Sequence, residues 1–386
     1  MRFEFATATH IIFGNGTIRD AAPLAAQMGK RAFIVTGRTV ERAEPLLKQL
    51  NKQAVECITF SVSSEPTTML VKAGIAQTRQ TKCDIVIGIG GGSVIDTAKV
   101  IAAMLTNSGE LEDYLEIVGL GKTITKNPAP FIAIPTTAGT GAEVTRNAVL
   151  GVPQYGSKVS MRSSLMLARL AVVDPELTYS MPPALTASTG LDALTQLIEP
   201  FVCNKANPLI DGVCREGLIR VGRSLLRAYE NGSDKSARED MALASHFSGL
   251  ALANAGLGAV HGFAGPLGGM ISAPHGLICA RLLPYVIEAN VKALQSRERG
   301  SPAISRYDEV AGLLTGKTTA RAAELVKLVQ NLCVKTKIPS LAELGLREQD
   351  FPTAIEKAKK SSSMKTNPIA LTDEELLGIL KNALIQ

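Results

Sequence analysis

Several residue types that carry specialised roles are scarce in this chain of 386 residues. Tryptophan is absent and aromatic residues make up 4%, so the core must consist mainly of alanine, valine, isoleucine and leucine. The six cysteines form no CxxC pair, which disfavours a disulfide framework and favours free thiols in a reducing compartment. The N-terminus lacks the long apolar run of a secretory signal. We therefore expect a cytoplasmic protein.

Nucleic-acid and membrane partners are also disfavoured. The net charge of +6 is small for this length, and the basic stretch at residues 357–365 contains no aromatic side chains that would stack on bases. The most apolar stretch, residues 250–273, is interrupted by His261 and Pro266, which favours a buried helix and loop over a membrane span. We expect neither kind of partner.

The first half of the chain alternates short apolar runs with helical stretches. The apolar runs cover residues 31–35, 83–89, 131–134 and 170–173, and each is followed by glycine, proline or aspartate within a few residues. Continuous apolar strands separated by helices are typical of a parallel sheet that helices cover on both faces. The pattern predicts an α/β N-terminal domain with a parallel Rossmann-like sheet over residues 1–182.

After Pro182-Pro183 the strand signals fade. Stretches of helical length and spacing cover residues 185–202, 208–231, 236–255 and 319–336. Thr372 and Glu375 have the spacing of a capping box at the start of a final helix. We predict an all-α C-terminal domain over residues 183–386. A division into two domains also fits the length, which exceeds the roughly 250–300 residues at which single cores stop growing.

A run of glycines follows the predicted strand at residues 83–89. Gly90, Gly91 and Gly92 lead into a predicted helix, where Ser93 takes the N-cap position and Asp96 lies three residues further on. Glycines let backbone amides approach an anion, and a helix N-terminus adds N–H donors and positive potential. The alternative is a tight strand-to-helix turn that needs glycine for steric reasons alone.

A second loop, residues 135–145, also follows an apolar strand and is rich in glycine and in hydroxyl residues, among them Thr136, Thr137 and Thr140. Two such loops at the carboxyl ends of strands in one sheet are typical of a nucleotide site. Neither loop matches G-x-G-x-x-G or the Walker pattern, which disfavours an ordinary Rossmann enzyme or a P-loop ATPase.

Four polar side chains in the second half form a candidate metal site. His261 and His275 flank a segment rich in glycine and proline, and Asp192 and Gln196 lie four residues apart, on one face of a predicted helix. Two imidazoles and a carboxylate are ligands for a divalent metal. The alternative is structural: a carboxylate near a helix N-terminus and two hydrogen-bonded core histidines.

Taken together, these segments resemble the iron-containing (group III) alcohol dehydrogenases of the dehydroquinate synthase-like superfamily. The similar segments occur in order along nearly the whole chain: residues 90–99, 135–141, 173–177, 190–195, 260–262, 273–276 and 366–368. The resemblance implies a nucleotide-binding α/β domain, a helical metal-binding domain, and hydride transfer between a nicotinamide and a small alcohol or aldehyde.

In that family one aspartate and three histidines hold Fe²⁺ or sometimes Zn²⁺. The resemblance therefore assigns Asp192, His261 and His275 as metal ligands and catalytic residues, with Gln196 at the position of the third histidine. An amide oxygen is a weaker ligand than imidazole for these metals, so occupancy depends on how Gln196 is tolerated. Gly265 is a second departure, because the family often has a histidine there that is suited to proton relay.

For the cofactor, the resemblance places the pyrophosphate on Gly90–Ser93 and Thr136, Thr137 and Lys158 along the nicotinamide half. NAD-preferring relatives carry an aspartate where this chain has Gly37. Its absence removes the repulsion of a 2′-phosphate, and Arg38 offers a partner for that phosphate, which favours NADP over NAD. The alternative is a turn glycine beside a surface arginine.

The resulting hypothesis is an NAD(P)-dependent alcohol dehydrogenase or carbonyl reductase with a metal-assisted mechanism, which relatives suggest is a homodimer formed through a strand at Phe3–His10. Because of Gln196 and Gly265, two alternatives stay open: a metal-independent reductase similar to maleylacetate reductase, and a non-catalytic NADP-binding protein. Turnover after complete removal of metal would distinguish the first, and tight NADPH binding without carbonyl reduction the second.

Overall fold

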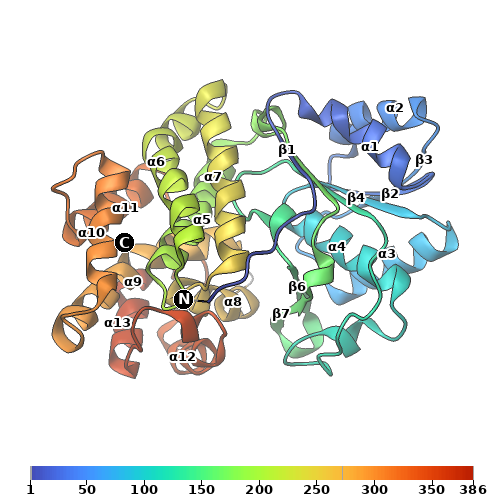
Figure 1. The fold of residues 1–386 in the computed structure, drawn as a ribbon. Coiled ribbons are helices and arrows are strands. Elements are labelled where there is room, and N and C mark those ends of the chain that lie inside the picture. The colour runs from blue at the N-terminus through green and yellow to red at the C-terminus, as the bar shows by residue number, and fades with distance from the viewer. Residues whose placement is uncertain (1, 272, 386) are drawn as a thin grey trace. The chain divides into compact units, whose positions relative to one another are not determined.

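The computed structural model describes residues 2–271 and 273–385 (Figure 1). The chain forms two compact units: Phe5–Thr137 with Gly141–Tyr179, and residues 2–4 and Ala138–Thr140 with residues 180–385. The predicted domain boundary after residue 182 falls close to the change of unit at Tyr179. The outermost residues of the two predicted domains, Met1 and Gln386, lie outside the described residues.

The first unit is built on a parallel six-stranded sheet. In spatial order its strands are β1 (Ile11–Phe13), β8 (Leu170–Val173), β5 (Phe131–Pro135), β4 (Ile85–Gly90), β2 (Arg31–Thr36) and β3 (Glu56–Ser61). The helices are α1 (Ala21–Met28), α2 (Glu44–Lys52), α3 (Thr68–Gln80) and α4 (Gly92–Thr106), and β6 (Asn147–Val152) and β7 (Ser157–Arg162) form a separate antiparallel pair. The predicted Rossmann-like sheet is confirmed.

The predicted apolar runs form β2, β4, β5 and β8, whose residues are almost all buried, whereas β1 and β3 were not predicted and are less buried. Every residue of β4 and β5 is buried, and one core cluster of this unit consists entirely of alanine, valine, leucine and isoleucine. Glycine also brings β4 close to α4, since a Cβ atom at Gly88 would lie 2.9 Å from the Cβ of Ala98. Close helix packing thus depends on that missing side chain.

The second unit is helical, as predicted. Its helices are α5 (Pro183–Val202), α6 (Pro208–Glu230), α7 (Lys235–Asn254), α8 (Ala259–Met270), α9 (His275–Arg297), α10 (Pro302–Thr315), α11 (Ala322–Lys335), α12 (Phe351–Lys360) and α13 (Asp373–Leu384). The capping box before α13 is present, with Glu375 N donating to Thr372 Oγ1 at 3.2 Å and Thr372 N donating to Glu375 Oε2 at 2.7 Å. The helix predicted to start at residue 319 begins instead at Ala322.

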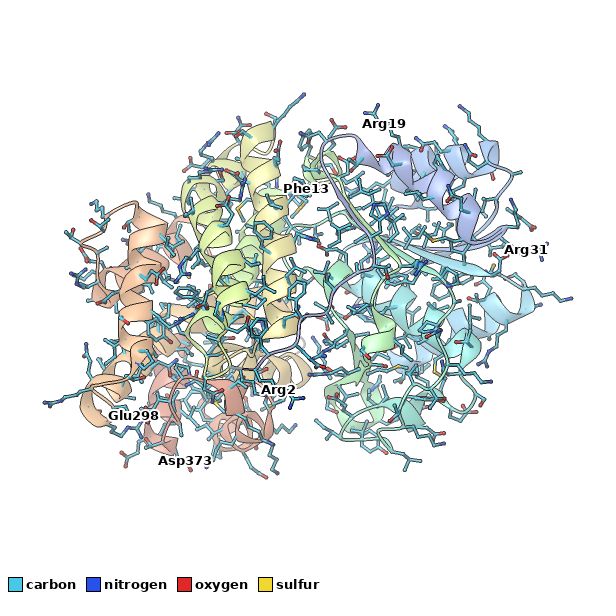
Figure 2. The ribbon with its side chains drawn as sticks, viewed as in Figure 1. Arg2, Phe13, Arg19, Arg31, Glu298 and Asp373 are labelled. Atoms are coloured by element: carbon cyan, nitrogen blue, oxygen red, sulfur yellow. The ribbon has the colours of Figure 1, made fainter. Side chains whose placement is uncertain are left out.

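Helix α5 is the centre of this unit and is buried along most of its length. It packs against α6, α7 and α9. Apolar side chains fill the interior, while charged residues such as Arg19 of the first unit and Glu298 and Asp373 of the second project into solvent (Figure 2). Asp192 and Gln196, two of the candidate metal ligands, therefore lie on the buried central helix of the unit.

Two further predictions concern the N-terminal segment Phe3–His10 and the apolar stretch at residues 250–273. Within the single chain, Phe3–His10 forms no strand, and the first strand is β1; Ala171 N of β8 donates a hydrogen bond to the carbonyl of His10 at 2.9 Å. The role suggested for this segment in a dimer stays a prediction. Within residues 2–271 and 273–385, no single helix is long and apolar enough to cross a membrane; α7 and α8 pass that test only as a pair bent by 96°.

Candidate functional site

The candidate metal site is built first from one face of α5. Asp192, Gln196 and Glu199 follow one another at intervals of four and three residues, so all three side chains point to the same side of the helix. All three are buried. Buried polar groups need partners: Gln196 meets Ser248 of α7, and Glu199 meets Val260 and His261 of α8.

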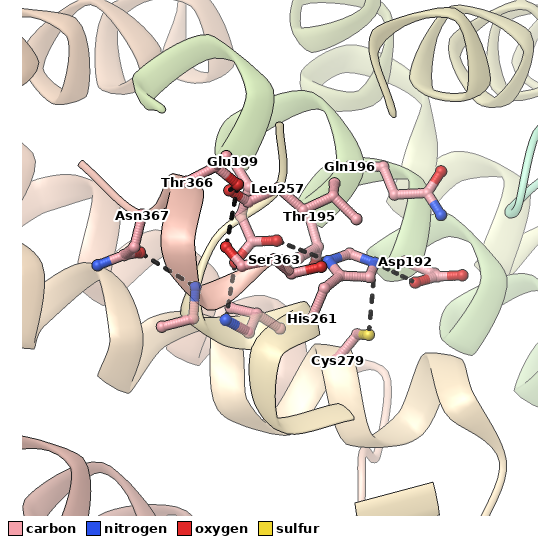
Figure 3. A network of polar contacts seen from close by, with 12 residues as sticks. Asp192, Thr195, Gln196, Glu199, Leu257, His261, Cys279, Ser363, Thr366 and Asn367 are labelled. Atoms are coloured by element: carbon pink, nitrogen blue, oxygen red, sulfur yellow. Dashed lines mark hydrogen bonds and ion pairs between the residues drawn. The ribbon is translucent and has the colours of Figure 1, made fainter. Parts of the chain in front are cut away.

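Helix α8 begins with no capping side chain of its own, and Glu199 supplies one from α5. Glu199 Oε1 accepts a hydrogen bond from Val260 N at 2.7 Å, and Asn367 Oδ1 accepts one from Ala259 N at 3.0 Å (Figure 3). Gly258 makes this possible, because a Cβ atom there would lie 2.7 Å from Glu199 Oε1. The same carboxylate continues to His261, whose Nδ1 lies 2.6 Å from Glu199 Oε2.

Helix α9 supplies the other side of the site. His275 is its first residue and Cys279 lies one turn further on, on the same face. Gly276 lets α9 approach α5 closely, since a Cβ atom at Gly276 would lie 2.5 Å from the carbonyl oxygen of Ser188. This close contact carries His275 and Cys279 up to Asp192.

Four side chains therefore converge: Asp192, His261, His275 and Cys279, with one potential ligand atom from each lying within 4.8 Å of the others. Asp192 Oδ1 is 3.7 Å from His261 Nε2 and 3.9 Å from His275 Nε2. Cys279 Sγ is 3.5 Å from His275 Nε2 and 3.9 Å from His261 Nε2. Asp192 Oδ1 is buried and has no hydrogen-bond partner among the described residues. A divalent cation in the centre would satisfy that oxygen, so the residues fit a metal.

The Glu199 carboxylate affects both the pKa of His261 and the tautomer of its neutral ring. Burial alone would lower the pKa of His261, but the Glu199 carboxylate at Nδ1 outweighs it and the net pKa is raised. With Nδ1–H donated to Glu199, the lone pair of neutral His261 is on Nε2, which faces Asp192 and Cys279. Burial, followed by the Asp192 and Glu199 carboxylates, raises the pKa of the Cys279 thiol well above its usual range.

Gln196 has a different environment from the other predicted ligands. Its Oε1 accepts a hydrogen bond from Ser248 Oγ of α7 at 3.0 Å. In Figure 3 the amide oxygen is directed away from the ring of His261. The structure thus brings together three of the four sequence-predicted ligands, Asp192, His261 and His275, around Cys279, and engages Gln196 with α7.

The glycine-rich loop of the first unit lies where β4 ends and α4 begins. Gly91 is the N-cap of α4 and no side chain caps the helix, so the prediction that Ser93 is the N-cap is wrong. The extended backbone of Gly91 starts the helix earlier, and Ser93 lies in its first turn, where its carbonyl accepts from Thr97 Oγ1 at 2.8 Å. An uncapped helix N-terminus keeps N–H donors available for a phosphate.

The second loop lies beside the first at the carboxyl edge of the sheet. Gly90 pairs with Pro135, Thr136 N donates to the Gly90 carbonyl at 2.9 Å, and a Cβ atom at Gly91 would lie 3.3 Å from Thr137 Cγ2. The strand order also reverses direction between β2 and β4, the place where open α/β sheets bind ligands. Gly90, Gly91, Gly92, Thr136 and Thr137 are therefore brought to one edge.

Three other predicted cofactor residues, Asp96, Lys158 and Thr140, lie in different surroundings. Asp96 Oδ2 accepts from Val149 N at 2.9 Å, and burial raises the pKa of its carboxyl despite nearby Lys99. Lys158, on β7, forms an ion pair with Glu65. Thr140 belongs to the short segment Ala138–Thr140 that clusters with the helical unit. Asp96 and Lys158 thus already have partners within the first unit.

Gly37 directly follows β2, next to the switch in strand order. A Cβ atom at Gly37 would meet nothing within 4 Å, and its carbonyl accepts from Ser61 Oγ at 3.0 Å. Arg38 beside it is exposed. Glycine is therefore not required at position 37 for steric reasons, which weakens the interpretation of Gly37 as a simple turn residue.

Two residues at the candidate metal site and beside it were not predicted from the sequence: Cys279 and Glu199. Cys279 follows His275 by four residues, the same spacing that pointed to Asp192 and Gln196. Glu199 follows Asp192 by seven residues, which is two turns on one helix face. The helical spacing was therefore available as a signal, but nothing in the sequence indicates that these faces meet.

Comparison with known proteins extends the resemblance to both units. Residues 8–175 match the model of the iron-containing alcohol dehydrogenases, and residues 186–384 match that of the C-terminal part of the same family. Alcohol dehydrogenase 4 of Saccharomyces cerevisiae is 36% identical over 379 residues, covering 96% of each protein. The 1,3-propanediol dehydrogenase of Klebsiella pneumoniae is 35% identical over 92% of each.

The chain belongs to the iron-containing alcohol dehydrogenase family. A crystal structure of 1,3-propanediol oxidoreductase superposes with a TM-score of 0.91 at 33% identity, covering 99% of this chain and 100% of that one. The predicted family and fold class are confirmed. This member of the family is an oxidoreductase that acts on CH–OH donors and interconverts alcohols and carbonyl compounds.

Proposed function

We propose that this chain reduces a small aldehyde or ketone to its alcohol, reversibly, with NADP(H) and a divalent metal held by Asp192, His261 and His275. One observation carries the metal part: the buried Asp192 Oδ1 without a hydrogen-bond partner among the described residues, 3.7 and 3.9 Å from two imidazole nitrogens. These separations are too long for hydrogen bonds but suit ligands that share one cation.

Each side chain has a distinct role in this proposal. Asp192 supplies the anionic ligand, and Glu199 holds His261 in the tautomer that presents Nε2. The metal, when bound, acts as a Lewis acid on the carbonyl oxygen of the substrate. Gly90–Ser93 would hold the pyrophosphate of a dinucleotide at the N-terminus of α4, and the nicotinamide of that cofactor would supply the hydride chemistry.

NADP is favoured over NAD by the end of β2. A Cβ atom at Gly37 would meet nothing within 4 Å, so packing does not require glycine there. Without a carboxylate at this position, a 2′-phosphate meets no repulsion, and the exposed Arg38 guanidinium can pair with it. The ratio of kcat/KM for NADPH to that for NADH measures this preference directly.

The substrate class is a short alcohol or its aldehyde. The relatives named above include dehydrogenases of 1,3-propanediol, which supports a small, polar substrate here. We also propose that the chain forms a homodimer and that it lies in a reducing, cytoplasmic compartment. The six free cysteines support the proposed compartment. Sedimentation equilibrium of the purified chain tests the dimer.

The central experiment is the double variant His261→Ala, His275→Ala, assayed with NADPH against a panel of short aldehydes and ketones. Loss of both imidazoles should abolish turnover, while NADPH still binds, as followed by nucleotide fluorescence. The matched control is His10→Ala, which removes an exposed histidine of the first unit. Full turnover in the double variant would contradict the metal mechanism, and turnover of the wild type after complete chelation would point to a metal-independent reductase.

A further inference from the structure

The cluster contains one potential ligand that does not belong to the Asp-His-His-His set of the resembling family. We infer that Cys279 is the fourth protein ligand of the metal, in place of Gln196, and that the resulting Asp-His-His-Cys site selects zinc over iron. The inference rests on the proposed metal site and adds to it the identity of one ligand and of the metal.

The geometry supports a shared ion. For tetrahedral zinc with bonds of about 2.0–2.1 Å to nitrogen or oxygen and about 2.3 Å to sulfur, ligand atoms lie roughly 3.3–3.6 Å apart. The separations around Cys279 Sγ are 3.5 Å to His275 Nε2 and 3.9 Å to His261 Nε2. Contraction by a few tenths of an ångström would bring the cluster to that geometry, within the reach of side-chain rotation.

A second and independent observation points to the same centre. Asp192 is 2% exposed, and its Oδ1 lacks a hydrogen-bond partner among the described residues. An isolated buried carboxylate oxygen costs several kcal/mol, by order of magnitude, unless a cation or a donor satisfies it. His261 Nε2 faces the same point, because its other nitrogen is held by Glu199 at 2.6 Å.

Gln196 is poorly suited to the fourth place. Its Oε1 lies 3.0 Å from Ser248 Oγ, so the amide contacts α7. Cys279, by contrast, is fully buried and its Sγ contacts both imidazoles of the cluster. The loss of an imidazole at position 196 is thus compensated from the opposite side of the site, by α9.

The chemistry of the set determines the metal. A thiolate is a soft ligand that favours zinc over Fe²⁺, and zinc also exceeds iron in the general affinity order for such sites. On binding, the Cys279 thiol loses its proton to solvent and forms the metal–sulfur bond. The two negative charges of Asp192 and Cys279 then balance the dication, which lowers the cost of burying it.

X-ray absorption at the zinc edge tests the inference on the intact wild-type protein, loaded with one zinc per chain. The expected spectrum contains one sulfur at about 2.3 Å together with nitrogen and oxygen at about 2.0–2.1 Å. A bound zinc with only nitrogen and oxygen neighbours would overturn the assignment of Cys279 and leave the proposed metal site standing. Failure to bind any zinc or iron would overturn both.

Variants and metal competition complete the test. Cys279→Ser should remove the sulfur signal and weaken zinc binding by at least about 100-fold, the upper end of the loss seen even for outer-sphere partners. Cys333→Ser is the matched control: this buried thiol of α11 donates to the carbonyl of Ala280, and its loss should leave the sulfur signal intact. Gln196→Ala should also keep the signal.

Metal choice is measured anaerobically with equimolar Zn²⁺ and Fe²⁺. The wild type should take up zinc at least about 10-fold in excess, and Cys279→Ser should reduce that ratio. An equal uptake of both metals by the wild type, or a ratio unchanged in Cys279→Ser, would overturn the zinc selectivity. Loss of zinc in Gln196→Ala but not in Cys279→Ser would assign the fourth place to Gln196 instead.

Discussion

Replacing Glu199 by glutamine tests how the site is oriented without touching a metal ligand. In the wild type, Glu199 accepts twice: Oε1 from Val260 N at 2.7 Å and Oε2 from His261 Nδ1 at 2.6 Å. In Glu199→Gln only one amide oxygen remains, and the buried Val260 N–H needs it. The amide NH₂ then faces Nδ1, so His261 must accept there and carry its proton on Nε2, the atom that should bind the metal.

The expected cost follows from these contacts. Binding a metal to the variant requires His261 to give up its favoured tautomer and to leave one buried donor without a partner, which costs about 1–3 kcal/mol. This agrees with the roughly 10–100-fold loss of affinity that removal of an outer-sphere partner causes, about 1.4–2.7 kcal/mol. Competition with a coloured chelator measures the affinity for zinc in wild type and variant.

The matched control is Glu343→Gln, since that carboxylate lies in the same unit and accepts from Ser340 N at 2.7 Å and Ser340 Oγ at 2.9 Å, away from the cluster. It should bind zinc like the wild type. If Glu199→Gln also binds zinc with unchanged affinity, the tautomer argument is refuted. Rescue of affinity in Glu199→Asp would show instead that the charge matters more than the length of the side chain.

Three further predictions address the first unit and one helical glycine. Gly37→Asp should fold normally, because nothing lies within 4 Å of the added Cβ, and should shift the NADPH-to-NADH ratio of kcat/KM at least about 10-fold toward NADH; an unchanged ratio would contradict the NADP assignment. Gly90→Ala places a Cβ 2.5 Å from Val94 Cγ2 and should lower the free energy of unfolding in urea by about 1–3 kcal/mol. Gly265→Ala in α8 adds a Cβ that meets nothing within 4 Å and should raise that free energy by about 0.5–1 kcal/mol. Equal urea midpoints for the two variants would refute the packing argument. The buried ammonium of Lys99 donates to the carbonyls of Ala142, Thr145 and Asn147 at 2.7–2.9 Å. Lys99→Met removes this donor and should lower the free energy of unfolding by about 3–5 kcal/mol. A loss below about 1 kcal/mol would show that those carbonyls find other donors.

The local pattern of the sequence determined the fold class and most elements. Continuous apolar runs such as residues 131–134 can be buried on both faces only in a parallel sheet between helices, and the sheet is there. The capping box at Thr372 and Glu375 likewise depends on residues three apart in the chain. Information of this kind is local, because hydrophobic periodicity and capping act over a few residues.

The residue at which α4 begins depends on backbone geometry that the sequence pattern did not reveal. A serine followed three residues later by an acid suggests an N-cap, yet the helix begins at Gly92 with Gly91 as the cap. The glycines allow an earlier start, since they accommodate close contacts that a side chain would block, such as Gly90 against Val94. The phosphate-binding interpretation survives this shift, because the uncapped amides are still at the helix N-terminus.

The sequence alone identified Asp192, His261 and His275 as candidate metal ligands, and helical spacing placed Asp192 and Gln196 on one face of a predicted helix. It could not reveal that α9 turns Cys279 toward the same point or that Glu199 reaches the first turn of α8. Those contacts depend on how three helices far apart in the chain pack, through backbone approaches at Gly258 and Gly276 that leave no room for a side chain. Which face of a helix meets which neighbour is a property of tertiary packing, and only the folded structure decides it.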